Sequence, residues 1–110
     1  MRNFMILAIF CVSILMAQNL QEHINECENN IAKSCSEVAA KLMQDDKTKA
    51  FDLFKKACEL NDANACSVAG SFLIDAQNFK EAKIFFDKSC ELKDKLGCEF
   101  ALDLERSKKL

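Results

Sequence analysis

Proline is absent from the sequence, and only two of its 110 residues are glycine. These two residue types supply many of the turns in a sheet of short strands. Their scarcity therefore argues against an all-β fold. Alanine, leucine, lysine, glutamate and phenylalanine dominate instead, which favours helices. At this length we expect one small all-α domain with a single core.

Histidine is nearly absent as well, since His23 is the only one in the chain. A catalytic zinc site needs several ligands, commonly histidines, to hold the metal and activate water. The cysteines also lack the Cys-x-x-Cys spacing of zinc knuckles and redox-active pairs. We therefore predict no metal site, no cofactor and no catalytic residue, and we expect His23 at the surface.

The N-terminal segment has the pattern of an export signal. A short basic start precedes an apolar run over residues 4–17, which is interrupted only by Ser13 and followed by polar residues. These features describe a secretory signal peptide, and we expect cleavage after Ala17. A membrane anchor is the alternative, but the run is shorter than the roughly 20 residues that a spanning helix needs. Cys11 suggests a lipoprotein, but Phe10 is bulky where a small residue is expected before a lipidated cysteine.

Cleavage would leave residues 18–110 as the exported domain, which we expect to be secreted or periplasmic in a bacterium. Loss of Arg2 leaves 14 basic against 17 acidic residues, a net charge of −3. This sign argues against nucleic-acid binding, which uses a basic surface. No stable membrane insertion is expected after cleavage, and the sequence does not indicate an oligomeric state.

Six cysteines remain in this domain, and they are regularly spaced. They form three pairs separated by eight positions, and the pairs recur after 31 and then 32 residues. A fixed period of this length is typical of a solenoid built from one repeated unit. An even number of cysteines in a small exported chain also indicates a disulfide framework. The pairs are Cys27 and Cys35, Cys58 and Cys66, and Cys90 and Cys98.

The residues around the cysteines repeat with helical periodicity. Apolar or small residues recur at positions 50, 53, 54, 57 and 58 and again at 82, 85, 86, 89 and 90, which is one face of an amphipathic helix. Each second cysteine opens a further helix, and a less regular helix is expected over about residues 20–28. Aspartate and asparagine between these segments suit helix N-caps, at Asp45-Asp46, Asn61-Asp62, Asn78 and Asp94. We expect six helices in three hairpins.

The bends between helices bring the cysteines of each pair together. Cys58 lies in the last turn of one expected helix and Cys66 in the first turn of the next, so a tight bend places their Cα atoms near the roughly 5.5 Å that a disulfide needs. We predict local pairing of 27 with 35, 58 with 66 and 90 with 98. Six cysteines allow 15 connectivities, and free buried thiols are a further alternative. By loop entropy, three local bridges contribute on the order of 7 kcal/mol at most.

The segments KKACELNDANAC and DKSCELKDKLGC resemble the Sel1-like repeats of the Helicobacter cysteine-rich protein family, over nearly all of the exported domain. The resemblance implies a short right-handed αα-hairpin solenoid with three hairpin disulfides. Ala69-Gly70 matches the family's usual leucine-glycine pair, whereas Val38-Ala39 and Ala101-Leu102 fit less well. The family's glycine-rich loop is missing, and the spacing from Gly70 to Ala82 is similar to that of a tetratricopeptide repeat.

Gly70 is expected to matter for helix packing. Glycine inside a helix costs about 1 kcal/mol relative to alanine, so its presence needs a reason. We predict that Gly70 contacts Ala82 and lets two helices approach closely. The other residues predicted to pack between helices are Ala50, Phe54 and Phe86. Three phenylalanines are expected either to cap the ends of the solenoid or to be buried in a partner: Phe51, Phe72 and Phe79.

Stacked helical hairpins curve, and their inner surface takes a peptide or a protein partner. Binding of an unidentified protein or peptide is therefore the predicted function. The outward positions of the helices that follow each second cysteine are small, polar and mildly acidic, which favours a basic or polar extended partner. These positions are Ser36, Ala40, Gln44, Ser67, Ser71, Asp75, Glu99, Asp103 and Arg106.

The resemblance also implies a different function. Members of the cysteine-rich family are described as penicillin-binding proteins with weak β-lactamase activity. Serine β-lactamases need the motifs Ser-x-x-Lys, Ser-Asp-Asn and Lys-Thr-Gly, and none of the three occurs here. A hydrolase would have to use a different site, and it is the alternative to a binding scaffold. Turnover of nitrocefin by the oxidised protein distinguishes the two.

Overall fold

The computed structural model describes residues 19–110, and every regular element in this part of the chain is a helix. Residues 19–28 are helical. They are followed by α2 (Ala32–Leu42), α3 (Lys47–Glu59), α4 (Ala63–Asp75), α5 (Phe79–Glu91) and α6 (Lys95–Ser107). The all-α fold class and the six expected helices are therefore confirmed for the described residues. The predicted signal peptide over residues 1–17, with cleavage after Ala17, lies outside them.

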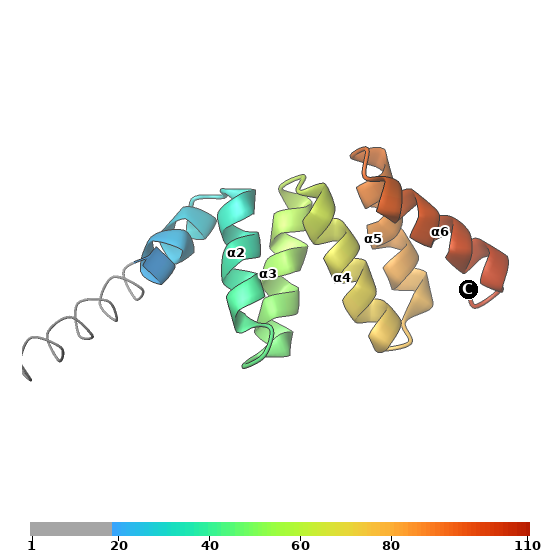
Figure 1. Cartoon of the computed structure of the whole chain (residues 1–110), viewed down its shortest axis with the longest axis horizontal. Helices are drawn as coiled ribbons and strands as arrows, with labels where there is room; N and C mark the ends of the chain where they lie inside the picture. The colour runs from blue at the N-terminus through green and yellow to red at the C-terminus, as the bar shows by residue number, and fades with distance from the viewer. Residues whose placement is uncertain (1–18) are drawn as a thin grey trace, which may run out of the picture.

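The helices lie in a row in chain order, from residues 19–28 at one end to α6 at the other (Figure 1). Each numbered helix packs against the next, and α4 also contacts α6. No helix within residues 19–110 has the length and apolar character needed to cross a bilayer. The result is a repeat-like succession of packed helix pairs.

The buried side chains form two clusters that meet at α4. One cluster joins α2, α3 and the first half of α4, and it includes Ala50, Phe54 and Ala69. The other joins the second half of α4 to α5 and α6, and it includes Ala82 and Phe86. The stripes predicted from the periodicity face these clusters, because Ala50, Phe54, Ala82 and Phe86 are all at most 4% exposed.

Four of the tight turns share one backbone solution. In each of them the residue after the end of the helix adopts the left-handed conformation, with a positive φ, at Asn30, Asn61, Gln77 and Lys93. In the second of these turns the amide of Asp62 donates to the carbonyl of Ala57, and the amide of Asn61 donates to that of Cys58. This pair of hydrogen bonds is the Schellman motif, which closes the carbonyl end of a helix.

The residue after each left-handed position begins the next helix. The carboxylate of Asp62 accepts from the amide of Ala65, and that of Asp94 accepts from the amide of Leu96. Asn78 and Asp46 cap α5 and α3 in the same manner. The predicted N-caps are therefore confirmed, whereas Ile31 begins α2 without a side-chain cap.

Three disulfides join neighbouring helices, between Cys27 and Cys35, Cys58 and Cys66, and Cys90 and Cys98. Their Cα atoms lie 4.6, 4.6 and 4.5 Å apart. The pairing predicted from the sequence is thus the pairing in the structure. Each bridge spans one of the Schellman turns, because the left-handed residue lies three positions after the first cysteine of the pair.

Two glycines mark close helix contacts. A Cβ built on Gly70 would lie 2.8 Å from two carbons of the Phe86 ring, so Gly70 makes room for that ring. The three atoms nearest to this position belong to Phe86 rather than to the predicted partner Ala82. A Cβ on Gly97 would lie 2.5 Å from the Cβ of Ser89, so this glycine lets α6 approach α5 beside the third disulfide.

Two of the three phenylalanines expected at the ends of the array lie inside it, within the stapled α3–α4 hairpin. The rings of Phe51 and Phe72 are 5.7 Å apart and join α3 to α4. Phe85 packs edge-on against Phe51 at 6.5 Å and extends this contact to α5. Both rings therefore pack within the array and do not cap its ends, while their burial by a partner stays a prediction.

Candidate functional site

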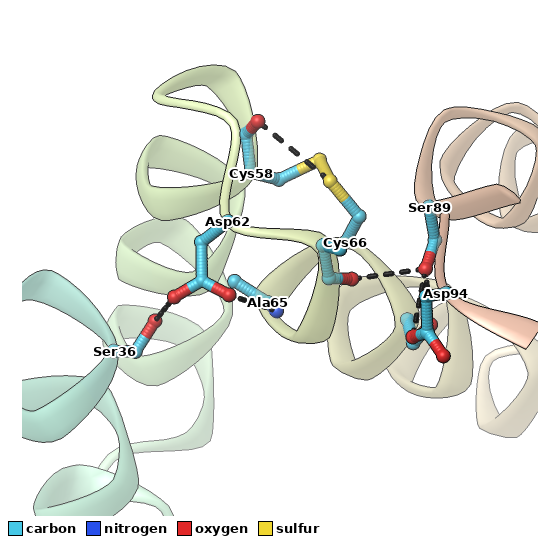
Figure 2. The surroundings of a disulfide bond; sticks show 9 residues. Ser36, Cys58, Asp62, Ala65, Cys66, Ser89 and Asp94 are labelled. Atoms are coloured by element: carbon cyan, nitrogen blue, oxygen red, sulfur yellow. Dashed lines mark hydrogen bonds between the residues drawn. A yellow bond between two sulfur atoms is a disulfide. The ribbon is translucent and has the colours of Figure 1, made fainter. Parts of the chain in front are cut away.

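A serine on one helix hydrogen-bonds to the cap of the next stapled turn. The hydroxyl of Ser36 in α2 donates to the carboxylate of Asp62 at 3.0 Å (Figure 2). The same carboxylate also caps α4 through the amide of Ala65 (Figure 2). One hairpin further on, Ser67 of α4 donates to Asp94 at 2.9 Å. These two contacts fix the position of each hairpin relative to the preceding one.

The second of these contacts is part of a larger polar cluster. The hydroxyls of Ser67 and Ser89 lie 2.6 Å apart, and Ser89 also lies within hydrogen-bond distance of the carbonyl of Ala63 and the carboxylate of Asp94. The hydrogen bond from Ser67 lowers the pKa of Asp94 below its ordinary value, and the bonds from Ser89 and the amide of Leu96 act in the same direction, against the effect of burial.

The position of Ser67 corrects the prediction for the binding surface. Ser67 is only 8% exposed, whereas the helical spacing placed it on the outward face. The stapled turn of the following hairpin covers it, which a periodicity within one helix does not reveal. Ser36 is half-buried for the same reason. Both serines therefore hold hairpins together, and Ser67 is closed to a partner.

A cavity of about 370 Å³ opens between α4, α5 and α6, and we call it the C-terminal groove. Aromatic and aliphatic side chains form its walls, and two carboxylates and one ammonium group lie at its border. The lining residues are Ser71, Ile74, Asp75, Phe79, Phe86, Phe100, Asp103, Leu104, Ser107 and Lys109. Three of the predicted surface residues, Ser71, Asp75 and Asp103, are thus brought together here.

A second cavity of about 430 Å³ lies on the other side of the same stretch of α4, and we call it the central groove. Its lining residues are Met43, Lys47, Val68, Ser71, Phe72, Asp75 and Ala76. Ser71 and Asp75 belong to both cavities. One exposed face of α4 therefore separates two adjoining hollows.

The remaining predicted surface residues lie elsewhere. Gln44, Glu99 and Arg106 are exposed, as is Ala40, but none of them lines either groove. Phe79, expected at an end of the array, lines the C-terminal groove. The sequence reasoning also missed Phe100, which is 43% exposed and packs on Phe86 with ring centroids 5.0 Å apart. The sequence did contain a signal for this exposed ring, because Phe100 is a large aromatic residue on the polar side of its helix.

The hydroxyls of the polar cluster are closed to solvent. Ser89 is fully buried and Ser67 nearly so, so a substrate cannot reach either hydroxyl of the polar cluster. Within residues 19–110, no group of three histidine, cysteine, aspartate or glutamate side chains is arranged to hold a metal ion. His23 is half-buried rather than fully at the surface, and its Nδ1 lies 3.0 Å from the carboxylate of Glu37.

No model of a known protein family matches the chain, and no curated protein matches it either.

Proposed function

We propose that the protein is an exported, disulfide-stapled scaffold that binds an extended segment of a protein or peptide across the exposed face of α4. In this proposal the hairpins form a short right-handed αα-hairpin solenoid with Sel1-like stapled turns. The observation that most supports this proposal is that two grooves adjoin along α4 and share Ser71 and Asp75. A bound segment that crosses this ridge fills both hollows.

The chemistry of the grooves supports a peptide ligand. Binding sites for such ligands combine apolar walls with a few polar groups that fix orientation. Phe100 and Met43 supply exposed apolar surface, at 43% and 39%, one in each groove. Hydrophobic side chains of a ligand would cover this surface, while the carboxylate of Asp75 lies within reach of its polar groups.

Export is the part of the proposal that the disulfides support. Disulfides persist in oxidising compartments and are rare in a reducing cytosol. Three bridges in 92 described residues indicate an oxidising environment of the extracellular kind. Secretion or periplasmic residence, through a signal peptide over residues 1–17, is the corresponding proposal.

The test begins with the full chain, expressed with its own leader and purified oxidised from a bacterial periplasm. Random peptides displayed on phage are selected on it, and the dissociation constants of selected peptides are measured by fluorescence anisotropy. The substitution Ser71→Arg places a bulky side chain on the ridge between the grooves, at an exposed position. We expect binding to weaken by at least about tenfold.

The matched control is Asn64→Arg, which adds the same side chain at an exposed position of the same helix outside both grooves. It should bind selected peptides like the unaltered protein, and both variants should melt at the same temperature. If Ser71→Arg binds normally, or if both variants lose binding equally, the grooves are not the binding surface and the proposal is wrong.

A further inference from the structure

The C-terminal groove already holds a cationic side chain of the protein itself. After α6 the backbone turns at Lys108, which has a left-handed φ of 57°. This turn carries Lys109 back over the groove, where its ammonium nitrogen lies 5.1 Å from the centre of the Phe79 ring. Lys109 is the only basic residue among those that line this groove.

From this arrangement we infer that the C-terminal groove recognises a lysine or arginine side chain of the partner, and that Lys109 occupies the same position in the free protein. The inference rests on the proposed function and names the chemical class of ligand that the groove selects. Binding of the partner exchanges one cation for another, so the tail acts as a built-in competitor.

The walls of the groove suit an amphipathic cation. An ammonium or guanidinium group over the face of an aromatic ring is attracted by the ring's quadrupole. The aliphatic stem of lysine or arginine packs against apolar surface while its charged end stays near water. Here Phe79 offers the ring, and Ile74 and Leu104 offer apolar surface beside it.

The charged residues at the border of the groove also favour a cationic ligand. Asp75 and Asp103 line the groove, and among residues 19–110 neither takes part in an ion pair. The neighbouring acids Asp87 and Glu105 differ, because both hold the ammonium group of Lys83, at 2.7 and 3.1 Å. Displacement of Lys109 would leave the groove with two carboxylates and no base, which favours a cation and disfavours an anionic ligand.

Two short probes test the inference: the capped tripeptides acetyl-Leu-Lys-Leu-amide and acetyl-Leu-norleucine-Leu-amide, which differ only in the ammonium group. Each is titrated into the oxidised, isotope-labelled protein and followed by the amide signals of Phe79, Asp103 and Leu104. We expect the lysine probe to bind about three- to tenfold more tightly, as befits one exposed cation–π contact with nearby carboxylates.

Variants separate the tail from the border charges. Lys109→Gln should tighten binding of the lysine probe several-fold because the competitor is gone, whereas Lys95→Gln makes the same charge change on α6 outside the groove and should have no effect. Asp75→Asn with Asp103→Asn should reduce the preference for lysine over norleucine, because only the contact with the Phe79 ring then favours the cation, while norleucine binding persists. All four substituted residues are exposed, and thermal melting verifies that each variant folds.

Equal binding of the two probes, or unchanged affinity in Lys109→Gln, overturns the inference but leaves peptide binding intact. If neither probe perturbs the groove signals while selected peptides lose affinity in Ser71→Arg, the cation site is wrong and the scaffold proposal stands. If neither probe perturbs the groove signals and the selected peptides also bind Ser71→Arg normally, both the cation site and the scaffold proposal are wrong.

Discussion

The turns at Cys58–Cys66 and Cys90–Cys98 have the same backbone but different contents. Both contain a Schellman motif, an aspartate N-cap and a disulfide with nearly equal Cα separation. In the first turn Ala57 and Ala65, both fully buried, fill the space between the helices. The equivalent positions of the second turn are Ser89 and Gly97.

The exchange replaces an apolar contact with a polar one. Ser89 adds a hydroxyl to the space, and Gly97 removes a side chain to make room for it. The hydroxyl then links α4, α5 and the cap of α6 through Ser67, Ala63 and Asp94. The sulfur bridge differs as well, since Cys58 and Cys66 are at most 1% exposed whereas Cys90 and Cys98 are half-buried. One backbone turn therefore accommodates two ways of filling its interior.

The largest expected effect comes from giving the second turn the first turn's alanine. In Gly97→Ala the new Cβ would lie 2.5 Å from the Cβ of Ser89 and 3.0 Å from the amide nitrogen of Cys90, so the helices must move apart. We expect a loss of about 1–3 kcal/mol in the free energy of unfolding, despite the better helix propensity of alanine. Urea denaturation of the oxidised protein measures it.

The reverse change in the first turn, Ala65→Gly, is the control. It creates no clash, and we expect it to cost only about 1 kcal/mol through lost propensity and a small gap. A Gly97→Ala variant as stable as the unaltered protein would show that the second turn does not depend on close approach at this position.

A smaller effect is expected from the serines that join the hairpins. Ser67→Ala removes the hydrogen bond that most lowers the pKa of Asp94, and we expect a loss of about 1 kcal/mol at neutral pH. Ser36→Ala removes the equivalent bond to Asp62 at a more exposed site and should cost less. Thermal melting of the two variants compares the contacts directly.

The effect of Ser67→Ala should depend on pH with a defined sign. Because the folded-state pKa of Asp94 lies below its ordinary value of 3.8, the carboxylate contributes stability above that pH and loses it as the pH falls through the folded-state pKa. The difference between Ser67→Ala and the unaltered protein should therefore shrink in strong acid. A difference that stays constant down to pH 2 would contradict this origin.

The smallest expected effect concerns the left-handed residue of each turn. The first turn has Asn61 at φ 71° and the second has Lys93 at φ 75°. Asparagine tolerates this region better than lysine does. Lys93→Asn should raise stability by about 0.5 kcal/mol, as a small increase in melting temperature, and Asn61→Lys should lower it by a similar amount. An unchanged melting temperature in both would show that the turn does not discriminate.

Features that depend on nearby residues could be predicted from the sequence. The cysteine pairs, the buried stripes and the caps at Asp62 and Asp94 all follow from spacing within one helix or one bend. The burial of Ser67 could not be predicted, because the turn that covers it comes 27 residues later. The C-terminal groove also escaped prediction, since it needs Phe79, Phe100 and Lys109 to converge from three separate segments.

The most direct test of the stapled scaffold is peptide mapping of the exported protein under non-reducing conditions, with free thiols alkylated beforehand. We predict three linked peptide pairs, 27 with 35, 58 with 66 and 90 with 98, and no alkylated cysteine among these six. Bridges that join different hairpins, or six alkylated thiols, would contradict the account.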